Sequence, residues 1–159
     1  RGQAEIWRGD GVAGRLRRGG AMAGWVGLGW VQALAEDAEQ LLKNRPEWRG
    51  RFQRILIEAH WCGLGTLARR PESRWRMTPT AIEGLLPLQR ELLEGLLPLL
   101  ADTGTLVYAT CTIHPAENTA QVRLLLEHHP ELNLLDETQR WPDAEGGGDG
   151  FYAAVLQRR

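Results

Sequence analysis

The sequence is poor in cysteine and has no long apolar run. Its two cysteines, Cys62 and Cys111, are too few for a disulfide framework or a four-cysteine zinc site. No apolar stretch approaches the roughly 18 residues of a membrane-spanning helix, and no signal-peptide pattern opens the chain. These absences favour a reduced compartment, and we expect a cytoplasmic protein without a membrane or metal partner.

An excess of charge of one sign is also missing, because 19 Lys and Arg residues nearly balance 20 Asp and Glu residues. Bulk charge therefore predicts no nucleic-acid partner, and such a partner would need a local basic patch. With 43% hydrophobic residues among 159, the chain can form one domain with its own core. Because it opens with Arg1 rather than methionine, we expect the start of a longer protein to be missing.

Strand and helix patterns alternate along the chain. Strands are predicted at residues 4–8, 30–34, 52–58, 105–110, 132–135 and 151–156. The apolar run within 52–58 predicts a strand buried on both faces, and 105–110 is the clearest buried strand. Helices are predicted from about Val12, from Thr78-Pro79 to Leu100, and from His114-Pro115 to about His128, and residues 37–44 are a short helix or a turn. Polar or turn-forming loops are predicted at 46–51, 60–76, 102–104 and 146–150.

Two prolines interrupt the leucine-rich helix that follows Thr78. Pro87 and Pro98 predict that this stretch is either two helices or one kinked helix. The whole order predicts an α/β sheet that is parallel at first and ends in an antiparallel hairpin.

Cys111 follows the clearest predicted strand and precedes a predicted helix. Open α/β sheets bind ligands beyond the carboxyl ends of their strands, and a helix N-terminus favours the reactive thiolate. Free cysteines are among the most buried residues, so residue type alone favours a structural role. The surrounding sequence is needed to decide between the two roles.

Four blocks of sequence resemble a known family, in the family's order. GTLVYATCTIHPAEN, residues 104–118, closely resembles the nucleophile motif of the Sun/Nop (RsmB-like) RNA cytosine-C5 methyltransferases, where a Thr-Cys pair ends a strand. Residues 52–79 are similar to the family's Asp-Ala-Pro-Cys-Ser-Gly block and Arg-Trp loop. Residues 88–100 resemble the helix between these blocks, and 149–156 resemble the closing strand. Together the blocks span residues 52–156, about two-thirds of the chain.

The resemblance implies a fold, a cofactor and a substrate. The fold would be a Rossmann-like class I methyltransferase sheet that lacks its first strand, over a single truncated catalytic domain, residues 1–159. S-adenosylmethionine would donate the methyl group to carbon 5 of a cytosine in RNA, most of all ribosomal RNA. Cys111 would add to carbon 6, which makes carbon 5 electron-rich, and the base would leave its stack to be reached.

The second block departs from the family pattern. Glu58 stands in place of the family's aspartate, and its carboxylate can still hydrogen-bond the cytosine edge. His60 replaces a proline, Trp61 stands at the family's second cysteine, and Cys62 comes one position later. Since adjacent residues point in different directions, the product-release role of that second cysteine is not carried over to Cys62, and structural packing explains Cys62 at least as well.

Two further acids are implied on the cofactor side. By resemblance, Asp10 and Asp37 align with the acids that the family places on the cofactor ribose and near the adenine, and Glu58 follows them in the family's order. A solvated loop acid is an equally good interpretation of each. The family's glycine-rich first motif has no counterpart, and it would lie before Arg1.

An alternative pattern overlaps these acids. Residues 9–14 (GDGVAG) match G-x-G-x-x-G, with Glu36 and Asp37 about 20 residues later, as in dinucleotide-binding domains. The preceding strand is short and polar, and the following segment is rich in glycine. We therefore favour a chance match over a dinucleotide-binding oxidoreductase.

A basic cluster containing one aromatic residue follows the second block. Arginine guanidinium groups bind phosphate and an indole stacks on a base, so the resemblance favours RNA contact over a solvated loop. The residues expected to contact RNA are Arg70, Arg74, Trp75 and Arg76, with Arg69 beside them.

Two hypotheses of different class remain for the chain. One is an active methyltransferase or its catalytic fragment, which Cys111 and Glu58 favour. The other is a non-catalytic remnant that binds RNA or nothing specific, which Trp61 and the absent glycine-rich motif favour.

Overall fold

The structure, a computed structural model, describes residues 5–25, 31–143 and 148–159. The predicted strand starts at Ala4 and Trp30 and part of the predicted loop at 146–150 lie outside these residues. The strands are β1 Trp7–Gly9, β2 Gln32–Leu34, β3 Phe52–Glu58, β4 Leu100–Thr110, β5 Leu132–Arg140 and β6 Phe151–Arg158. The helices are α1 Ala13–Trp25, α2 Leu41–Asn44, α3 Pro79–Leu96 and α4 Thr119–His128. Short 3-10 turns lie at Ala38–Gln40, Pro46–Trp48, Leu64–Thr66, Pro71–Trp75 and Leu97–Leu99.

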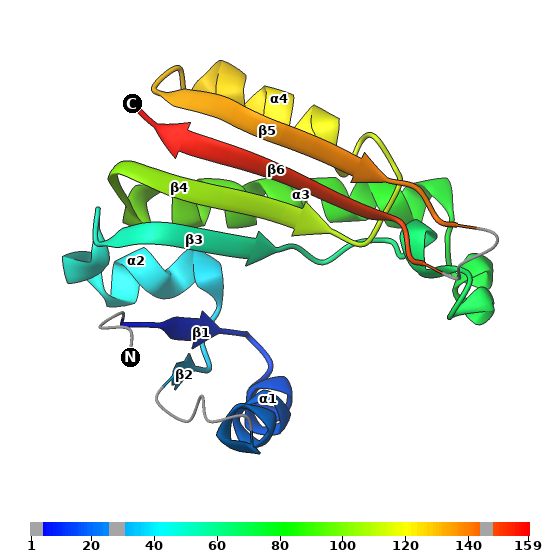
Figure 1. Cartoon of the computed structure of the whole chain (residues 1–159), viewed down its shortest axis with the longest axis horizontal. Coiled ribbons are helices and arrows are strands. Elements are labelled where there is room, and N and C mark those ends of the chain that lie inside the picture. Colours follow the sequence, from blue (N-terminus) through cyan, green and yellow to red (C-terminus); the bar gives the residue numbers. More distant parts are fainter. Residues whose placement is uncertain (1–4, 26–30, 144–147) are drawn as a thin grey trace.

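The described strands form two sheets. β1 and β2 pair in parallel, and the second sheet has the order β3-β4-β6-β5 (Figure 1). Within it β3 and β4 are parallel, whereas β6 runs antiparallel to both β4 and β5. The predicted change from parallel pairing to a closing antiparallel hairpin is confirmed. The Rossmann-like sheet implied by the resemblance is present as two separate sheets, because β1 and β3 do not pair with each other.

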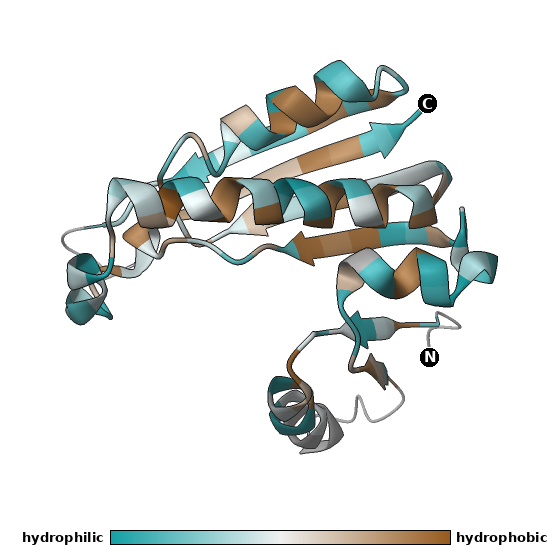
Figure 2. Cartoon of the chain, turned by 180° about the vertical axis from the view of Figure 1, so that it is seen from behind, coloured by the Kyte–Doolittle hydropathy of each residue, from teal (hydrophilic) through white to brown (hydrophobic). Residues whose placement is uncertain are grey.

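The main core lies between the four-stranded sheet and two helices. Figure 2 shows α3 and α4 against the same face of this sheet. Alternate residues of β4 and β6 point toward these helices, as the two-residue period of a strand requires. Fully buried side chains from both strands and both helices form the core, including Leu106, Tyr108, Leu156, Leu93 and Val122.

A second core joins the two sheets. Trp48 is only 4% exposed and packs with Leu41 and Leu99. Its ring centroid lies 4.8 Å from that of Trp7 on β1 and 5.2 Å from that of Phe52 on β3. The prediction that residues 46–51 form a polar loop is therefore wrong at Trp48, because this indole is needed to fill the space between the sheets.

The expectation that β3 is buried on both faces is also wrong. Ile57 is buried against the helices, but Leu56 on the opposite face is 63% exposed. β3 is an edge strand of its sheet, and Figures 1 and 2 show α3 and α4 on only one face of it. An apolar run therefore indicated a strand correctly without indicating two-sided burial.

The start of α3 follows the prediction, whereas the predicted interruption at Pro87 is not a helix boundary. Thr78 is the N-cap, and its hydroxyl accepts a hydrogen bond from the Ala81 backbone N–H at 3.1 Å. The helix continues through Pro87 to Leu96. Pro87 is exposed, so water can satisfy the carbonyl that loses its partner. Pro98 lies in the 3-10 turn that ends the helix.

Two other predicted boundaries are wrong. The predicted turn at 102–104 lies inside β4, where the pairing with β3 shifts and Thr103 has a φ of 60°, as at a β-bulge. The helix predicted from His114 begins instead at Thr119. The residues between, Glu117 and Asn118 among them, form a turn whose side chains are buried and hydrogen-bonded.

Among the described residues, no helix combines the length and the apolar character needed to cross a bilayer.

Candidate active site

Four of the predicted site residues lie at the carboxyl ends of parallel strands. Glu58 is the last residue of β3, and Cys111 directly follows β4. Asp10 directly follows β1, and Asp37 lies shortly after β2. The carboxyl ends of parallel strands share one edge of a sheet, which is where open α/β sheets bind ligands.

Cys111 is enclosed by the backbones of two other loops. The Gly150 N–H, just before β6, donates a hydrogen bond of 2.7 Å to the Gly65 carbonyl. A Cβ atom added at Gly65 would lie 2.6 Å from the carbonyl oxygen of Cys111 and would also strike the Gly150 carbonyl. Three loops, after β3, after β4 and before β6, therefore meet in backbone contact at Cys111, and only a glycine fits at position 65 without displacing them.

An ion pair fastens the same loops beside Cys111. Arg69, in the loop after β3, donates to both carboxylate oxygens of Asp149, with Nε at 3.1 and 2.9 Å from them. This pair holds the pKa of Asp149 below its usual range. Because Arg69 and Asp149 flank the Cys111 loop, their charges both act on the thiol.

The predicted activation of Cys111 by a helix N-terminus is wrong. Burial raises the pKa of the Cys111 thiol, the charges of Asp149 and Glu58 raise it further, and only Arg69 lowers it. The helix that should have favoured the thiolate begins eight positions later, at Thr119, because the intervening residues are used in a buried turn. Arg69 is therefore the charge that favours the thiolate form of Cys111.

Cys62 lies in a buried polar cluster rather than free at the surface. Its thiol shares a 3.2 Å hydrogen bond with the Thr112 hydroxyl, and its backbone N–H donates to Glu117 at 2.9 Å. Burial, together with the Glu117 carboxylate, raises the pKa of Cys62 to about 11. A thiol held protonated in this way is a poor nucleophile, which supports the packing role over a catalytic one.

The loops that carry Asp10 and Asp37 are in contact. Asp10 accepts a hydrogen bond from the Val12 N–H at 2.8 Å and forms an ion pair with Arg15 at 3.3 Å. The carboxylate of Asp37 lies directly against the backbone of Gly11. The two acids therefore flank one stretch of backbone at the start of α1.

The predicted RNA-contact residues lie in and around the 3-10 turn Pro71–Trp75. Trp75 is 77% exposed, and the Arg74 guanidinium stacks on its ring at 4.6 Å from the centroid. Arg70 and Arg76 flank this turn and are exposed as well. Arg69, directly before Arg70, is bound to Asp149 near Cys111. This basic surface therefore lies at the same end of the sheet as Cys111.

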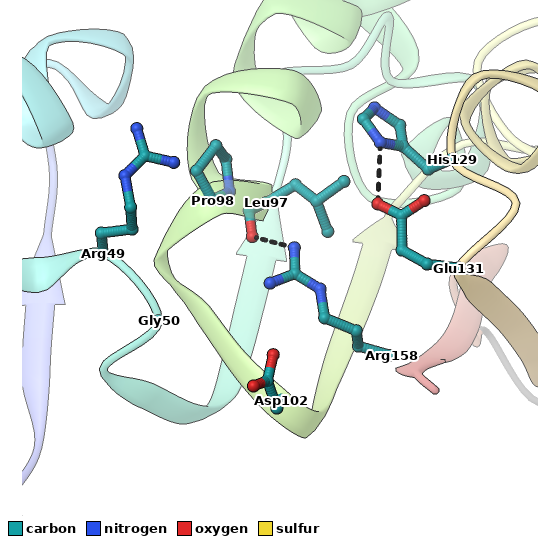
Figure 3. Close-up of a pocket in the computed structure, with 8 residues that line it drawn as sticks. All are labelled: Arg49, Gly50, Leu97, Pro98, Asp102, His129, Glu131 and Arg158. Carbon is teal, nitrogen blue, oxygen red and sulfur yellow. Dashed lines mark hydrogen bonds and ion pairs between the residues drawn. The ribbon is translucent and has the colours of Figure 1, made fainter.

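A pocket of about 360 Å³ lies at the other end of the four-stranded sheet (Figure 3). Its lining residues are Arg49, Gly50, Leu97, Pro98, Asp102, His129, Glu131 and Arg158. They come from the loop before β3, the turn between α3 and β4, the amino ends of β4 and β5 and the last residues of β6, away from the carboxyl edge that carries Cys111. This pocket is therefore separate from the candidate site.

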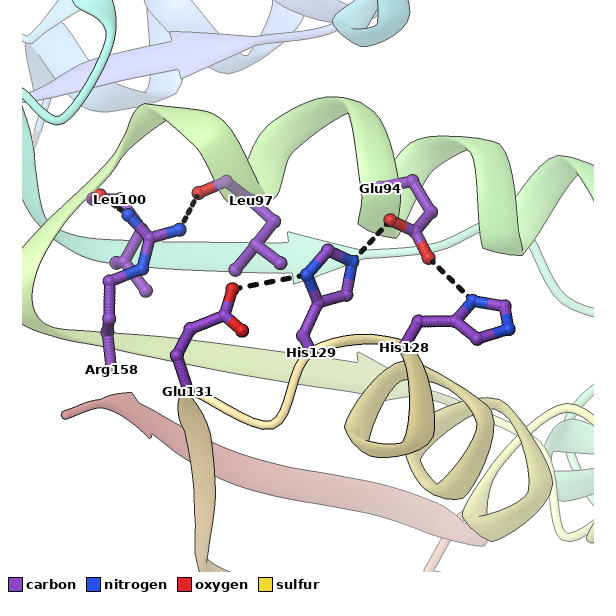
Figure 4. Close-up of polar contacts among 7 residues, drawn as sticks. All are labelled: Glu94, Leu97, Leu100, His128, His129, Glu131 and Arg158. Atoms are coloured by element: carbon purple, nitrogen blue, oxygen red, sulfur yellow. Dashed lines mark hydrogen bonds and ion pairs between the residues drawn. The ribbon is translucent and has the colours of Figure 1, made fainter.

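The polar contacts around that pocket hold helix ends in place (Figure 4). The Glu94 carboxylate on α3 contacts His129 Nε2 at 2.6 Å and His128 Nδ1 at 3.4 Å. Arg158 donates to the carbonyls of Leu97 and Leu100 at 3.0 and 2.7 Å, which satisfies groups at the end of α3. Within the described ranges no group of three or more His, Cys, Asp or Glu residues is arranged to hold a metal ion.

Sequence reasoning missed several residues that shape the site. Gly65 and Glu117 belong to blocks that carry the resemblance, but their contacts depend on distant residues and no local pattern indicates them. Asp149 was placed in the closing-strand block without its partner Arg69. A sequence pattern alone does not pair residues that lie 80 positions apart.

Comparison with known proteins gives a consistent picture. The sequence profile of the family described as "16S rRNA methyltransferase RsmB/F" matches residues 4–157. A Synechocystis sp. protein described as "Probable ribosomal RNA small subunit methyltransferase B" is 38% identical over 154 residues, which are 97% of this chain and 34% of that protein. A Vibrio cholerae protein described as "Ribosomal RNA small subunit methyltransferase B" is 38% identical over 118 residues, 70% of this chain and 27% of that protein.

Solved structures agree with the fold. The crystal structure of PH0851 superposes with a TM-score of 0.90 at 28% identity over 98% of this chain and 37% of that chain. The structure of NSun6 from Pyrococcus horikoshii with SFG gives a TM-score of 0.79 at 23% identity, over 98% of this chain and 41% of that chain. The fold is thus that of the Rossmann-like methyltransferases. The chain spans about a third of the length of the curated relatives it matches.

Proposed function

Because the chain belongs to the RsmB/F family of 16S rRNA methyltransferases, we propose that it carries the methyl-transfer site of such an enzyme, and that it methylates carbon 5 of a cytosine in RNA through a covalent adduct on Cys111. The observation that carries this proposal is the position of Cys111. It directly follows β4 at the carboxyl edge of the sheet, where the loops of Gly65 and Gly150 fix its backbone.

The chemistry requires a thiolate at a fixed position. The Cys111 thiolate adds to carbon 6 of the cytosine, and the electron pair of the 5,6 double bond moves so that carbon 5 becomes nucleophilic. Carbon 5 then takes the methyl group that S-adenosylmethionine supplies from its sulfonium. Loss of the carbon 5 proton to a base and breakage of the carbon 6–sulfur bond restore the double bond and the thiolate.

Three charged side chains act on the thiol of Cys111. Its pKa is raised by burial and by Asp149 and Glu58, and Arg69 opposes this. We expect Glu58 also to accept a hydrogen bond from the cytosine edge, since it ends the strand next to β4 and is exposed. A longer side chain than the family's aspartate changes the reach of this contact but not its chemistry.

We expect Asp10 to contact the ribose of the cofactor and Asp37 to lie near its adenine. In Asp10 one carboxylate oxygen accepts the Val12 N–H, which leaves the other for hydroxyl donors. Asp37 lies across the Gly11 backbone from it. The same segment has the strand, turn and helix of the dinucleotide-binding pattern, but the family match over residues 4–157 favours a methyl donor over a dinucleotide. A methyltransferase structure similar to this chain was solved with SFG, an analogue of S-adenosylmethionine.

RNA is the proposed partner of the basic surface. Arg70, Arg74 and Arg76 offer guanidinium groups for phosphates, and the exposed Trp75 offers a face on which a base can stack. The relatives are described as acting on small-subunit ribosomal RNA, and we propose ribosomal RNA as the substrate class here.

Calorimetry with S-adenosylmethionine tests the proposal. We expect micromolar binding that is lost in Asp10→Ala and kept in Asp136→Ala, a matched change at an exposed aspartate of β5. Transfer of labelled methyl to RNA should then depend on Cys111. Absence of binding at millimolar cofactor would contradict the proposal for this chain and favour a non-catalytic remnant that binds RNA.

A further inference from the structure

Glu117 is a carboxylate with no exposed surface, which is unusual for a charged side chain. It lies in the turn between β4 and α4, six residues after Cys111. A buried carboxylate is costly unless hydrogen bonds satisfy both of its oxygens. Because Glu117 is fully buried near the nucleophile, the groups that its carboxylate holds in place bear on the position of Cys111.

Three donors from three separate elements point to Glu117. Its Oε2 atom accepts from the Cys62 backbone N–H at 2.9 Å and from Gln89 Nε2 on α3 at 3.0 Å. Its Oε1 atom accepts from the Thr112 hydroxyl at 3.3 Å. The carboxylate thus joins the loop after β3, the middle of α3 and the residue next to Cys111.

We call the Glu117 carboxylate and its three donors the Glu117 joint. Further hydrogen bonds connect this joint to the backbone around Cys111. The Thr112 hydroxyl accepts the His114 backbone N–H at 3.1 Å and shares a hydrogen bond with the Cys62 thiol. Asn118, the neighbour of Glu117, donates from its side chain to the Thr112 carbonyl at 3.0 Å. Glu117 and Asn118 therefore both hold the chain on the C-terminal side of Cys111.

We propose that Glu117 is a positioning residue for the methyl-transfer reaction, which acts through Thr112 to lock the Cys111 loop onto the Cys62 loop. The inference rests on the proposed function, because it concerns the placement of the same nucleophile. Misplacement of a reacting group by about 1 Å can cost roughly 100-fold in rate, and a joint with three donors prevents such movement.

Two substitutions separate the charge of Glu117 from its shape. Glu117→Gln keeps one oxygen for Cys62 and Gln89 and lets the Thr112 hydroxyl rotate, so the fold should survive. Glu117→Ala removes the joint. We expect turnover to fall about 100-fold in Glu117→Ala and less in Glu117→Gln, with cofactor and RNA affinities within about twofold of the parent. Glu83→Gln, at an exposed glutamate of α3, is the matched control.

A second measurement does not depend on activity. Amide hydrogen exchange should show that Glu117→Gln and Thr112→Val each loosen both loops, residues 60–65 and 111–116, together. In the double variant the rate losses should be smaller than the sum of the single effects, because both residues act through one joint. Thr112→Val also serves if Glu117→Ala does not fold.

The outcomes distinguish the inference from the proposed function. Turnover within twofold of the parent in Glu117→Ala and in Thr112→Val, or exchange that rises in one loop only, would overturn the positioning role. A parent chain without methyl transfer would instead contradict the proposed function, and the exchange of the two loops would still decide whether Glu117 couples them.

Discussion

The two sheets of this molecule carry the two halves of the proposed site, and they are held very differently. In the four-stranded sheet, β4 pairs with β6 over six consecutive residues and rests on a fully buried core. In the other sheet, β1 and β2 pair over only three residues, and their contact with the rest depends on Trp7 and Leu34 packed around Trp48. The nucleophile thus has a rigid scaffold, whereas the acids proposed for the cofactor depend on one small core.

Replacement of the nucleophile should have the largest effect, and it should leave both sheets intact. Cys111→Ser should lower methyl transfer by at least about a thousandfold, because a hydroxyl is far less nucleophilic than a thiolate. The rate is measured with labelled methyl donor. Cys62→Ser is the matched control and should retain activity. An active Cys111→Ser protein would refute the covalent route.

Removal of the core around Trp48 should separate the β1-β2 sheet from the four-stranded sheet. Trp48→Ala should cost about 3–5 kcal/mol of stability, since it empties the contact between β1 and β3. Cofactor affinity and amide protection of β1 should be lost before those of β4. Trp141→Ala, at a tryptophan that is 62% exposed, should cost under about 0.5 kcal/mol. Equal loss of protection in both sheets would show that they form one cooperative unit.

A single methyl group added at Gly65 should disturb the site around Cys111 and leave the cofactor site unchanged. Gly65→Ala places a Cβ against the backbone of Cys111 and should lower turnover about 100-fold with cofactor affinity unchanged. Gly65 is not among the glycines with a positive φ, so its effect is steric rather than conformational. Gly84→Ala meets nothing within 4 Å and should stabilise α3 by about 0.5–1 kcal/mol. Full activity in Gly65→Ala would mean that the three loops move freely.

The smallest expected effect concerns the charges beside Cys111. Arg69 lowers the pKa of Cys111 and Asp149 raises it. Arg69→Gln should therefore move the pH profile of Cys111 alkylation to higher pH, and Asp149→Asn should move it to lower pH. The change at a fixed pH near the thiol's pKa should be roughly two- to fivefold. Mass spectrometry of the alkylated peptide follows Cys111 separately from Cys62. Shifts of the same sign in both variants would contradict this electrostatic account.

Local patterns predicted the four-stranded sheet well and its surroundings poorly. β3 was predicted at its observed bounds, and the Thr78 cap was predicted correctly, because apolar runs and capping residues act within a few positions. The burial of Trp48 and the exposure of Leu56 depend on which elements pack on which face of a sheet. No local sequence pattern indicates that packing for either residue.

The candidate site shows the same limit. Cys111 and Glu58 were proposed as site residues because family motifs surround them, and both lie at the expected strand ends. The pKa of Cys111 was predicted in the wrong direction, because its determinants come from burial and from Asp149 in a distant block. The partners of Glu117 lie up to 55 positions away, so no local pattern indicated its role.

The most direct test of the central claim is to trap the adduct. A cytosine with fluorine at carbon 5 cannot release a proton there, so the carbon 6–sulfur bond remains after methyl transfer. The protein is incubated with S-adenosylmethionine and RNA that contains this base, and the linked peptide is located by mass spectrometry. We predict an RNA-linked peptide at Cys111 that is absent in Cys111→Ser. A link at Cys62, or methylation of ordinary RNA by Cys111→Ser, would contradict the account.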